Sequence, residues 1–362
     1  MKRIVTLLVV NLLVLSVFAQ VQVYPLGNLP EKVKYTGSVT YALPSTTLKV
    51  TVSVSKVQDV RGYFADYAES LLGLTNIIQQ NSTHYLINSV EIEPLKTPDM
   101  TEVYRAFTSN AVLAESMNKA PLTAHVAFPD GYLTAYQTHT ASLPEFFKNY
   151  ADISYTQQQE TFVDTKIIDG VVTQVPANHT KTVSKSFENK AREAADAIMK
   201  SRKDQYNLVA GEQETPYTGE ALAIMLSELK NWESNYMSLF TGVSIADTIQ
   251  YVFYFTPNSK LEQMTAFYFS ENKGLNPTEG AAANAYTLNF NPRYPKMFEV
   301  AEWYFPQSGF LTRNRQPVHV TLSHDKKVHD FGVVNMYQAG STFVVQPSAK
   351  EPFDINQVGI VF

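Results

Sequence analysis

The chain has 362 residues, with 29 Lys and Arg against 34 Asp and Glu, and a formal net charge of −5. A mildly acidic chain without a basic tract is a poor candidate for binding nucleic acid or an anionic membrane surface. It contains no cysteine, which excludes disulfides, a thiolate nucleophile and a cysteine-ligated metal site. Its 21 Tyr and 21 Phe favour a β-rich globular protein.

The first 19 residues have the three regions of a secretory signal peptide. Lys2 and Arg3 precede an apolar run from Ile4 to Leu15, and a small-residue cleavage site ends at Ala19. We therefore expect cleavage after Ala19 and export. The apolar run is shorter than the roughly 20 residues that span a bilayer, and no later segment is long enough without charged residues. No transmembrane segment is expected in the mature chain.

Residues 20–184 are expected to form a β-rich domain with one short helix. Apolar residues alternate with polar ones over 48–54, which predicts a half-buried strand. Apolar residues at helical spacing over 64–72 predict the helix, and Gly73 stands at its C-terminal cap. Asp169-Gly170 predicts a tight hairpin turn. Two further strands are expected at 84–93 and 102–108.

Residues 185–242 have the pattern of two amphipathic helices. The first carries a thin apolar stripe and ends at Gly211, and the second carries a broader apolar face and ends at Gly242. Helices joined by about seven residues usually pack antiparallel. This segment therefore predicts an antiparallel helical hairpin.

Residues 243–362 return to short strands separated by turn residues, which indicates a second β-rich domain. The fold class predicted for the chain is α+β, predominantly β. Two β-rich halves, each resembling a sandwich or a small barrel, are separated by the helical hairpin. The strands expected in the C-terminal half are 249–255, 265–269, 286–290, 302–305, 318–322, 327–334, 341–345 and 359–362.

Several segments, in this order, resemble a known family. They are YALPSTTLKVTVSV (41–54), GYFADYAESLLGL (62–74), ADAIMKSRKDQYNLVAGE (195–212), LFTG (239–242) and MYQAGSTFVVQP (336–347). The chain is similar to exported proteins of Bacteroides and its relatives that are catalogued as domain of unknown function 4831. The family has no established activity, cofactor or catalytic residue, so the resemblance assigns none. It implies a Gram-negative host, and hence the periplasm or the cell surface as the destination.

Sequence motifs of common enzymes are missing from the chain. There is no G-x-S-x-G nucleophile elbow, no H-E-x-x-H zinc motif and no glycine-rich phosphate loop. The sequence therefore favours a non-enzymatic binding or assembly module of the envelope, without a cofactor. The alternative is a glycan- or peptide-directed hydrolase whose residues come from several strands, because catalytic triads also occur without local signatures.

Aromatic strands are the main hint of binding. Tyr251, Phe253 and Phe255 share one face of a strand, and Phe267 and Phe269 follow on the next one. If exposed, these rings could stack on a glycan or contact an envelope protein. The alternative interpretation is that the rings fill a hydrophobic core, where phenylalanine is usually found.

Three histidines occur at five-residue spacing: His319, His324 and His329. Imidazole suits zinc or copper, but residues five apart on a strand face opposite sides, so His319 diverges from His324. If 325–328 formed a four-residue loop, His324 and His329 would become a cross-strand pair. That pair is one candidate metal site, and a polar hairpin without a metal is the other interpretation.

Asp247-Thr248-Ile249 matches a pattern of O-glycosylation in exported Bacteroides proteins, which is Asp, then Ser or Thr, then an apolar residue. Thr248 is therefore a candidate modification site. A chance tripeptide at the entrance of a strand is the alternative.

Overall fold

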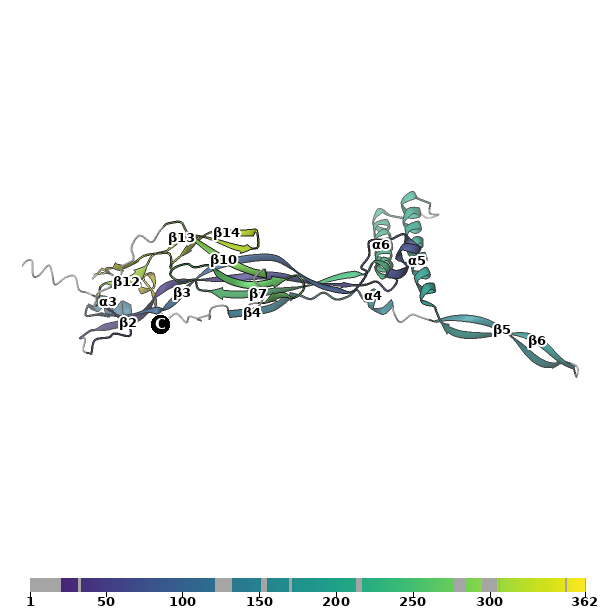
Figure 1. Cartoon of the computed structure of the whole chain (residues 1–362), viewed down its shortest axis with the longest axis horizontal. Coiled ribbons are helices and arrows are strands. Elements are labelled where there is room, and N and C mark those ends of the chain that lie inside the picture. The colour runs from purple at the N-terminus through teal and green to yellow at the C-terminus, as the bar shows by residue number, and fades with distance from the viewer. Residues whose placement is uncertain are drawn as a thin grey trace, which may run out of the picture. The chain divides into compact units, whose positions relative to one another are not determined.

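The computed structural model describes residues 21–31, 34–120, 132–150, 155–168, 171–212, 217–276, 284–294, 305, 307–348 and 350–361; at 132, 155–168 and 171–184 it describes the backbone alone. Strands predominate over helices in the described residues (Figure 1). The predicted α+β, predominantly β class is confirmed. Among the described residues, the strand orders are open and do not close into a barrel.

Strands and helices have the following bounds. The strands are β1 (Val21–Pro25), β2 (Gly37–Val60), β3 (Ser82–Thr108), β4 (Tyr132–His139), β5 (Tyr155–Ile168), β6 (Val171–Ser184), β7 (Val243–Phe255), β8 (Met264–Ser270), β9 (Gly274–Asn276), β10 (Ala285–Pro292), β11 (Gln307–Ser308), β12 (Phe310–Arg313), β13 (Gln316–His324), β14 (Lys327–Met336), β15 (Thr342–Val345) and β16 (Ile360–Val361). The helices are η1 (Ala65–Tyr67), α2 (Ala68–Leu72), α3 (Ala111–Asn118), α4 (Glu145–Asn149), α5 (Phe187–Ala210), α6 (Gly219–Thr241) and η4 (Ile355–Gln357).

The chain divides into two compact units, each built from segments that are distant in sequence. The first unit comprises Met1–Val54, Leu86–Gln137 and Ile249–Phe362, and the second comprises Ser55–Tyr85 and Thr138–Thr248. The domains expected at 20–184, 185–242 and 243–362 follow one another along the chain, whereas each unit combines residues from before and after the helical hairpin.

The largest sheet has seven strands in the order β11–β1–β3–β2–β7–β4, with β16 paired to β2. It therefore contains strands from both β-rich halves of the sequence. Antiparallel pairing places Val21 opposite Thr108 in β1 and β3, and Ile360 opposite Ala42 in β16 and β2. The alternating segment 48–54 lies inside β2 and its apolar residues are buried, as predicted.

Strand β3 is one continuous strand where the sequence predicts two, at 84–93 and 102–108. The prediction of two strands is wrong, because the pairing continues through the segment between them, which contains Pro94 and Pro98. β1 covers only Tyr104–Thr108 on its side of β3. The two prolines lie beyond the part of β3 that β1 covers, and such an edge needs no N–H donor.

A five-stranded sheet in the order β14–β13–β10–β8–β9 completes the main architecture of the first unit. The strands expected at 265–269, 286–290, 318–322 and 327–334 lie within β8, β10, β13 and β14. The strand expected at 302–305 lies outside the described residues except for Phe305. β12 and β15 form a separate antiparallel pair.

Aromatic rings link the two larger sheets inside the first unit. Phe253 of β7 stacks on Phe267 of β8 with ring centroids 5.7 Å apart, and Phe267 stacks on Tyr286 of β10 at 4.7 Å. Phe255 lies beside Phe253, and His324 lies on the far face of Tyr286, at 5.9 and 4.1 Å. We call these five side chains the aromatic stack. Its contacts bury apolar area and orient the rings.

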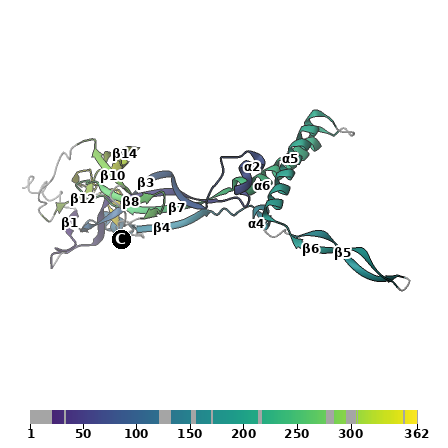
Figure 2. The ribbon, with the colours of Figure 1, turned by 45° about the vertical axis from the view of Figure 1, so that its right-hand side comes forward.

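Helices α5 and α6 of the second unit lie side by side and run in opposite directions (Figures 1 and 2), which confirms the predicted hairpin. Ser186 and Thr218 cap their N-termini, because each hydroxyl accepts a hydrogen bond from a backbone N–H three residues later. Gly211 ends α5 in the left-handed conformation that favours glycine. Among the described residues, no helix is both long and apolar enough to cross a membrane.

Two further parts of the second unit match the sequence pattern, whereas α4 is a helix that the sequence analysis did not predict. The predicted helix at 64–72 forms as η1 and α2, and Gly73 has the positive φ expected of its cap. β5 and β6 pair antiparallel, with Ile168 opposite Val171 around the predicted turn, whose residues 169–170 lie outside the described part. The core packs one face of α5 and the end of α6 against the short helices; its buried residues are Phe64, Ala68, Phe147, Ala191, Ala194, Ala195, Ile198, Leu239 and Phe240.

Candidate functional site

Four of the five aromatic residues predicted as a binding surface on β7 and β8 are buried. Phe253 and Phe267 are fully buried, Phe255 is 4% exposed and Phe269 is 9% exposed. Tyr251 is half-buried on the same strand as Phe253. The rings fill the space between two sheets, so the core interpretation of this pattern is the correct one.

The histidines are separated by the register of β13 and β14. The turn is two residues long, with Asp325 at a φ of 51°, and the register places His324 opposite Lys327 and His329 opposite Leu322. The four-residue loop at 325–328 is therefore wrong, and His324 and His329 do not form a cross-strand pair.

Each histidine of this stretch has its own partner. His324 belongs to the aromatic stack, and its Nδ1 lies 3.1 Å from the carbonyl oxygen of Ala285. His319 Nε2 lies 2.7 Å from Asp330 Oδ1, and the ring of His329 packs edge-on against Phe331. Within the described part of the chain, no three His, Cys, Asp or Glu residues gather as a metal site would require.

Thr248, the candidate modification site, is half-buried in β7. Its carbonyl oxygen accepts a hydrogen bond from Thr138 Oγ1 at 3.2 Å, and Asp247 Oδ1 accepts one from the Ala141 N–H at 2.9 Å. Both residues of the motif thus take part in holding the segment around Thr138 and Ala141 against β7. Modification of Thr248 stays a prediction.

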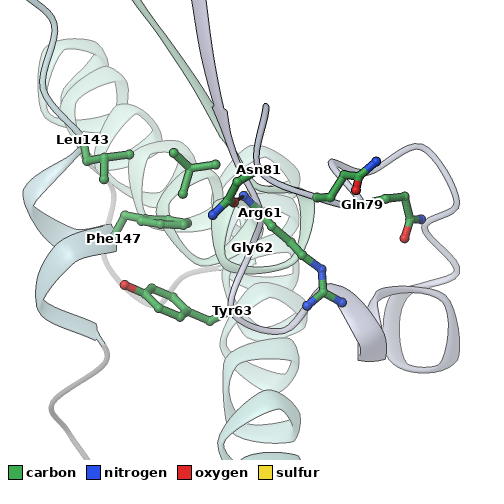
Figure 3. A pocket seen from close by; sticks show the side chains of 9 residues that line it. Arg61, Gly62, Tyr63, Gln79, Asn81, Leu143 and Phe147 are labelled. Carbon is green, nitrogen blue, oxygen red and sulfur yellow. Dashed lines mark hydrogen bonds between the residues drawn. The ribbon is translucent and has the colours of Figure 1, made fainter. Parts of the chain in front are cut away.

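A pocket that sequence reasoning missed lies in the second unit (Figure 3). Three separate segments line it, namely residues 60–63, residues 79–81, and Leu143 with Phe147, and its volume is about 540 Å³. Figure 3 shows the rings of Tyr63 and Phe147 on one side and the side chains of Arg61, Gln79 and Asn81 on the other. We call this site the Tyr63 pocket.

The end of α6 fixes the backbone of the Tyr63 pocket. The Phe64 N–H donates to the Leu239 carbonyl at 2.7 Å, and the Ile78 N–H donates to the Thr241 carbonyl at 2.9 Å. Gly62 passes so close to this helix end that an added Cβ would lie 2.5 Å from the Leu239 oxygen. Only glycine permits this approach, so the position of the pocket loop depends on Gly62.

The aromatic wall is preformed. Tyr63 stacks on Phe147 with ring centroids 4.9 Å apart and planes inclined by 29°. Phe147 is 2% exposed, whereas Tyr63 is only half-buried. Phe147 therefore supports Tyr63 from the core and orients its ring along the wall of the pocket.

The opposite side of the pocket is polar. Asn81 Oδ1 accepts a hydrogen bond from the Arg61 backbone N–H at 2.7 Å, which joins two of the lining segments. The guanidinium of Arg61 donates to the carboxylate of Asp66. Gln79 and Gln80 are exposed at the rim. Amide and guanidinium groups thus supply several N–H donors and some carbonyl acceptors to one small volume.

Asp59 anchors the strands next to this polar side. Ser244 Oγ of β7 donates to Asp59 Oδ1 at 2.5 Å, and Ser82 Oγ of β3 donates to Oδ2 at 2.8 Å. Both hydrogen bonds lower the pKa of Asp59 below its ordinary value, and the bond from Ser244 has the larger effect. His84, whose Nδ1 lies 3.5 Å from Asp59 Oδ2, lowers the pKa further. Since β2 lies between β3 and β7, the carboxylate connects three neighbouring strands.

The polar groups that line the Tyr63 pocket can hold a ligand through hydrogen bonds. Among the described residues that line the Tyr63 pocket there is no Asp, Glu or His. A hydrolase acting on glycans needs two carboxylates, and most other hydrolases need a general base. The lining instead combines an aromatic wall with neutral amides and one guanidinium.

The comparisons with known proteins give one match. A family model described as "Domain of unknown function (DUF4831)" matches residues 37–348, which include every segment of the Tyr63 pocket. No curated protein and no solved structure matches the chain.

Proposed function

The chain belongs to the family described as a domain of unknown function (DUF4831), and we propose a function for it from the geometry of the Tyr63 pocket. The protein is a non-enzymatic binding module of the Gram-negative envelope, and the pocket holds a polyhydroxylated glycan. The observation that carries this proposal is the stacked Tyr63 ring facing a group of amides and a guanidinium in one concave site.

Sugars have two kinds of surface, and the pocket offers a complement to each. The C–H face of a pyranose ring is apolar and stacks on an aromatic ring, which Tyr63 provides. Neighbouring hydroxyls both donate and accept hydrogen bonds, as the amides of Gln79 and Gln80 do. A pocket of several hundred Å³ with a few polar groups is typical of small-ligand sites.

Arg61 narrows the ligand class. Guanidinium binds carboxylates through paired, charge-assisted hydrogen bonds. A sugar that carries a carboxylate would therefore bind more tightly than a neutral sugar. Asp66 already accepts a hydrogen bond from this guanidinium. The preference for uronic acid over neutral sugar is therefore modest and sensitive to salt.

Export completes the proposal. Lys2, Arg3 and the apolar run that ends at Leu15 have the pattern of a secretory leader, with cleavage after Ala19. The mature protein would then meet glycans in the periplasm or at the cell surface. Mass determination of the mature N-terminus after cell fractionation tests this part. A chain that retains Met1 in the cytoplasm would contradict it.

Binding is tested by isothermal titration calorimetry with neutral and uronic-acid oligosaccharides as probes. We expect saturable binding of at least one class. Tyr63→Ala should weaken it about tenfold, because the stacking surface is lost, and Gln79→Ala about threefold, because a hydrogen bond is lost. Tyr217→Ala and Gln263→Ala remove an exposed tyrosine and an exposed amide outside the pocket and should leave the affinity unchanged.

Two results would overturn the proposal. One is equal weakening by Tyr63→Ala and Tyr217→Ala, which would move the site elsewhere. The other is release of new reducing ends during incubation of the wild-type protein with the same oligosaccharides. That release would favour the alternative function, a glycan-directed hydrolase.

A further inference from the structure

A second concave surface is lined by residues 204–212 of α5 and its C-terminal end and by residues 224–232 of α6. Figure 2 shows these two helices side by side. It has a volume of about 600 Å³. The residues that line it are Asp204, Asn207, Leu208, Glu212, Ile224, Met225, Glu228, Leu229 and Trp232. We call it the helical groove. None of these residues lines the Tyr63 pocket.

Five of the nine residues that line the helical groove are large and apolar, and two of these are exposed to solvent. Trp232 is 61% exposed and Ile224 is 59% exposed, whereas buried residues of the same two helices, such as Ile198 and Leu239, are fully covered. Large apolar side chains that gather on one face of a helix pair typically mark a contact surface. Tryptophan in particular contributes strongly to protein–protein binding.

The charged residues that line the groove are all acidic. Asp204, Glu212 and Glu228 contribute three carboxylates, and no Lys, Arg or His is among the described residues that line it. The nearest arginine along α5, Arg202, is occupied in an ion pair, since its Nε lies 2.7 Å from Glu233 Oε1. The lining of the groove therefore combines an apolar strip with three carboxylates.

We propose that the helical groove docks a cationic amphipathic helix of a partner protein. The apolar face of such a helix would cover Ile224 and Trp232, and its Lys or Arg residues would meet the three carboxylates. An anionic lipid surface is disfavoured by the same carboxylates. A second copy of this chain would have to supply a basic apolar face.

Trp232 is a built-in reporter for this proposal. The chain has two tryptophans, Trp232 and Trp303, so Trp303→Phe leaves a single emitting residue in the groove. The probe is a Leu/Lys peptide of about three helical turns, with a Leu/Glu peptide of the same pattern as its control. We expect the Leu/Lys peptide to shift the emission of Trp232 to the blue in a saturable, salt-sensitive manner, and the Leu/Glu peptide to leave it unchanged.

Charge variants test the rim. In the Trp303→Phe background, the double variant Asp204→Asn with Glu228→Gln should lower the affinity for the Leu/Lys peptide by about two- to thirty-fold, because two partly exposed ion pairs are lost. Glu220→Gln removes an exposed carboxylate of α6 outside the groove and should leave the affinity for the Leu/Lys peptide unchanged. Circular dichroism confirms that each variant keeps its helices.

Four results would overturn the proposal. Equal binding of both peptides, or an unchanged affinity in the double variant, would show that the carboxylates do not select the ligand. A blue shift that grows with protein concentration in the absence of peptide would identify a second copy as the occupant. A blue shift with anionic vesicles but not with the Leu/Lys peptide would identify a membrane surface.

Discussion

The aromatic stack of the first unit and the helical groove of the second place large side chains in opposite environments. Phe253 and Phe267 are fully buried between two sheets, whereas Trp232 and Ile224 are more than half exposed between two helices. Both sets have the periodic apolar pattern of a structured segment. The difference is that a second sheet covers the first set, and nothing in the described part of the second unit covers the other.

This contrast shows why apolar character alone does not locate a binding site. A strand between neighbouring strands is covered on its faces by other layers, so its aromatic residues stabilise the fold. A helical hairpin packs one face on the core, here through Ala191, Ala194 and Ile198, and leaves the other face to solvent. Aromatic residues on that outer face are available for a partner.

The variant with the largest expected effect on stability is Phe253→Ala. The change leaves a cavity in the aromatic stack and should lower the free energy of unfolding by about 3–5 kcal/mol. Phe343→Ala removes the same side chain from a site that is 44% exposed and should cost much less. Urea unfolding followed by circular dichroism measures both. Equal losses would mean that the stack does not support the core of the first unit.

Local features of the fold could be predicted from the sequence because their causes are local. The two helices of the hairpin end at Gly211 and Gly242 as predicted, and these signals lie within the helical hairpin itself. The alternation at 48–54 identifies a strand of which one face is buried. Each of these patterns depends on neighbours fewer than five residues away.

Features that depend on pairing could not be predicted in this way. The two-residue turn at Asp325 changes the partners of both His324 and His329, because a shift in hairpin register realigns every residue of the strand. The sequence offers no strong signal for a turn of that length.

The Tyr63 pocket was missed for a related reason. Tyr63, Asn81 and Phe147 come from segments with no recognisable motif, and only tertiary contacts with the end of α6 bring them together. The one local signal is the polar run Gln79-Gln80-Asn81 after two isoleucines, which is typical of any surface loop.

A second test concerns how polar contacts hold the second unit, in contrast to the apolar stack of the first. The pKa of Asp59 is lowered in the folded protein, so its contribution to stability is present above the unfolded value of about 3.9 and is lost as the pH falls through the folded value. Asp59→Asn should cost about 1 kcal/mol at neutral pH, and this difference should shrink below about pH 4.

Urea unfolding between neutral and acidic pH measures the contribution of Asp59. Ser244→Ala, which removes one of the two hydroxyl donors, should give a smaller loss with the same pH dependence. A difference between Asp59→Asn and wild type that stays constant down to the lowest pH would show that the ionised carboxylate is not the group that holds β2, β3 and β7 together.

The smallest expected change in stability comes from Trp232→Ala, and it separates the two regions most clearly. Because this side chain is 61% exposed, its loss should change the free energy of unfolding by less than about 0.5 kcal/mol, far below the loss expected for Phe253→Ala. The same variant should lower the affinity for a labelled Leu/Lys peptide by at least about tenfold, as expected of a tryptophan at the centre of a contact. Fluorescence anisotropy measures this affinity. A residue that stabilises the fold would give the reverse result, a large loss of stability with unchanged peptide binding. Trp232 would then act as a core residue, as the rings of the aromatic stack do in the first unit. The helical groove would lose its main proposed contact.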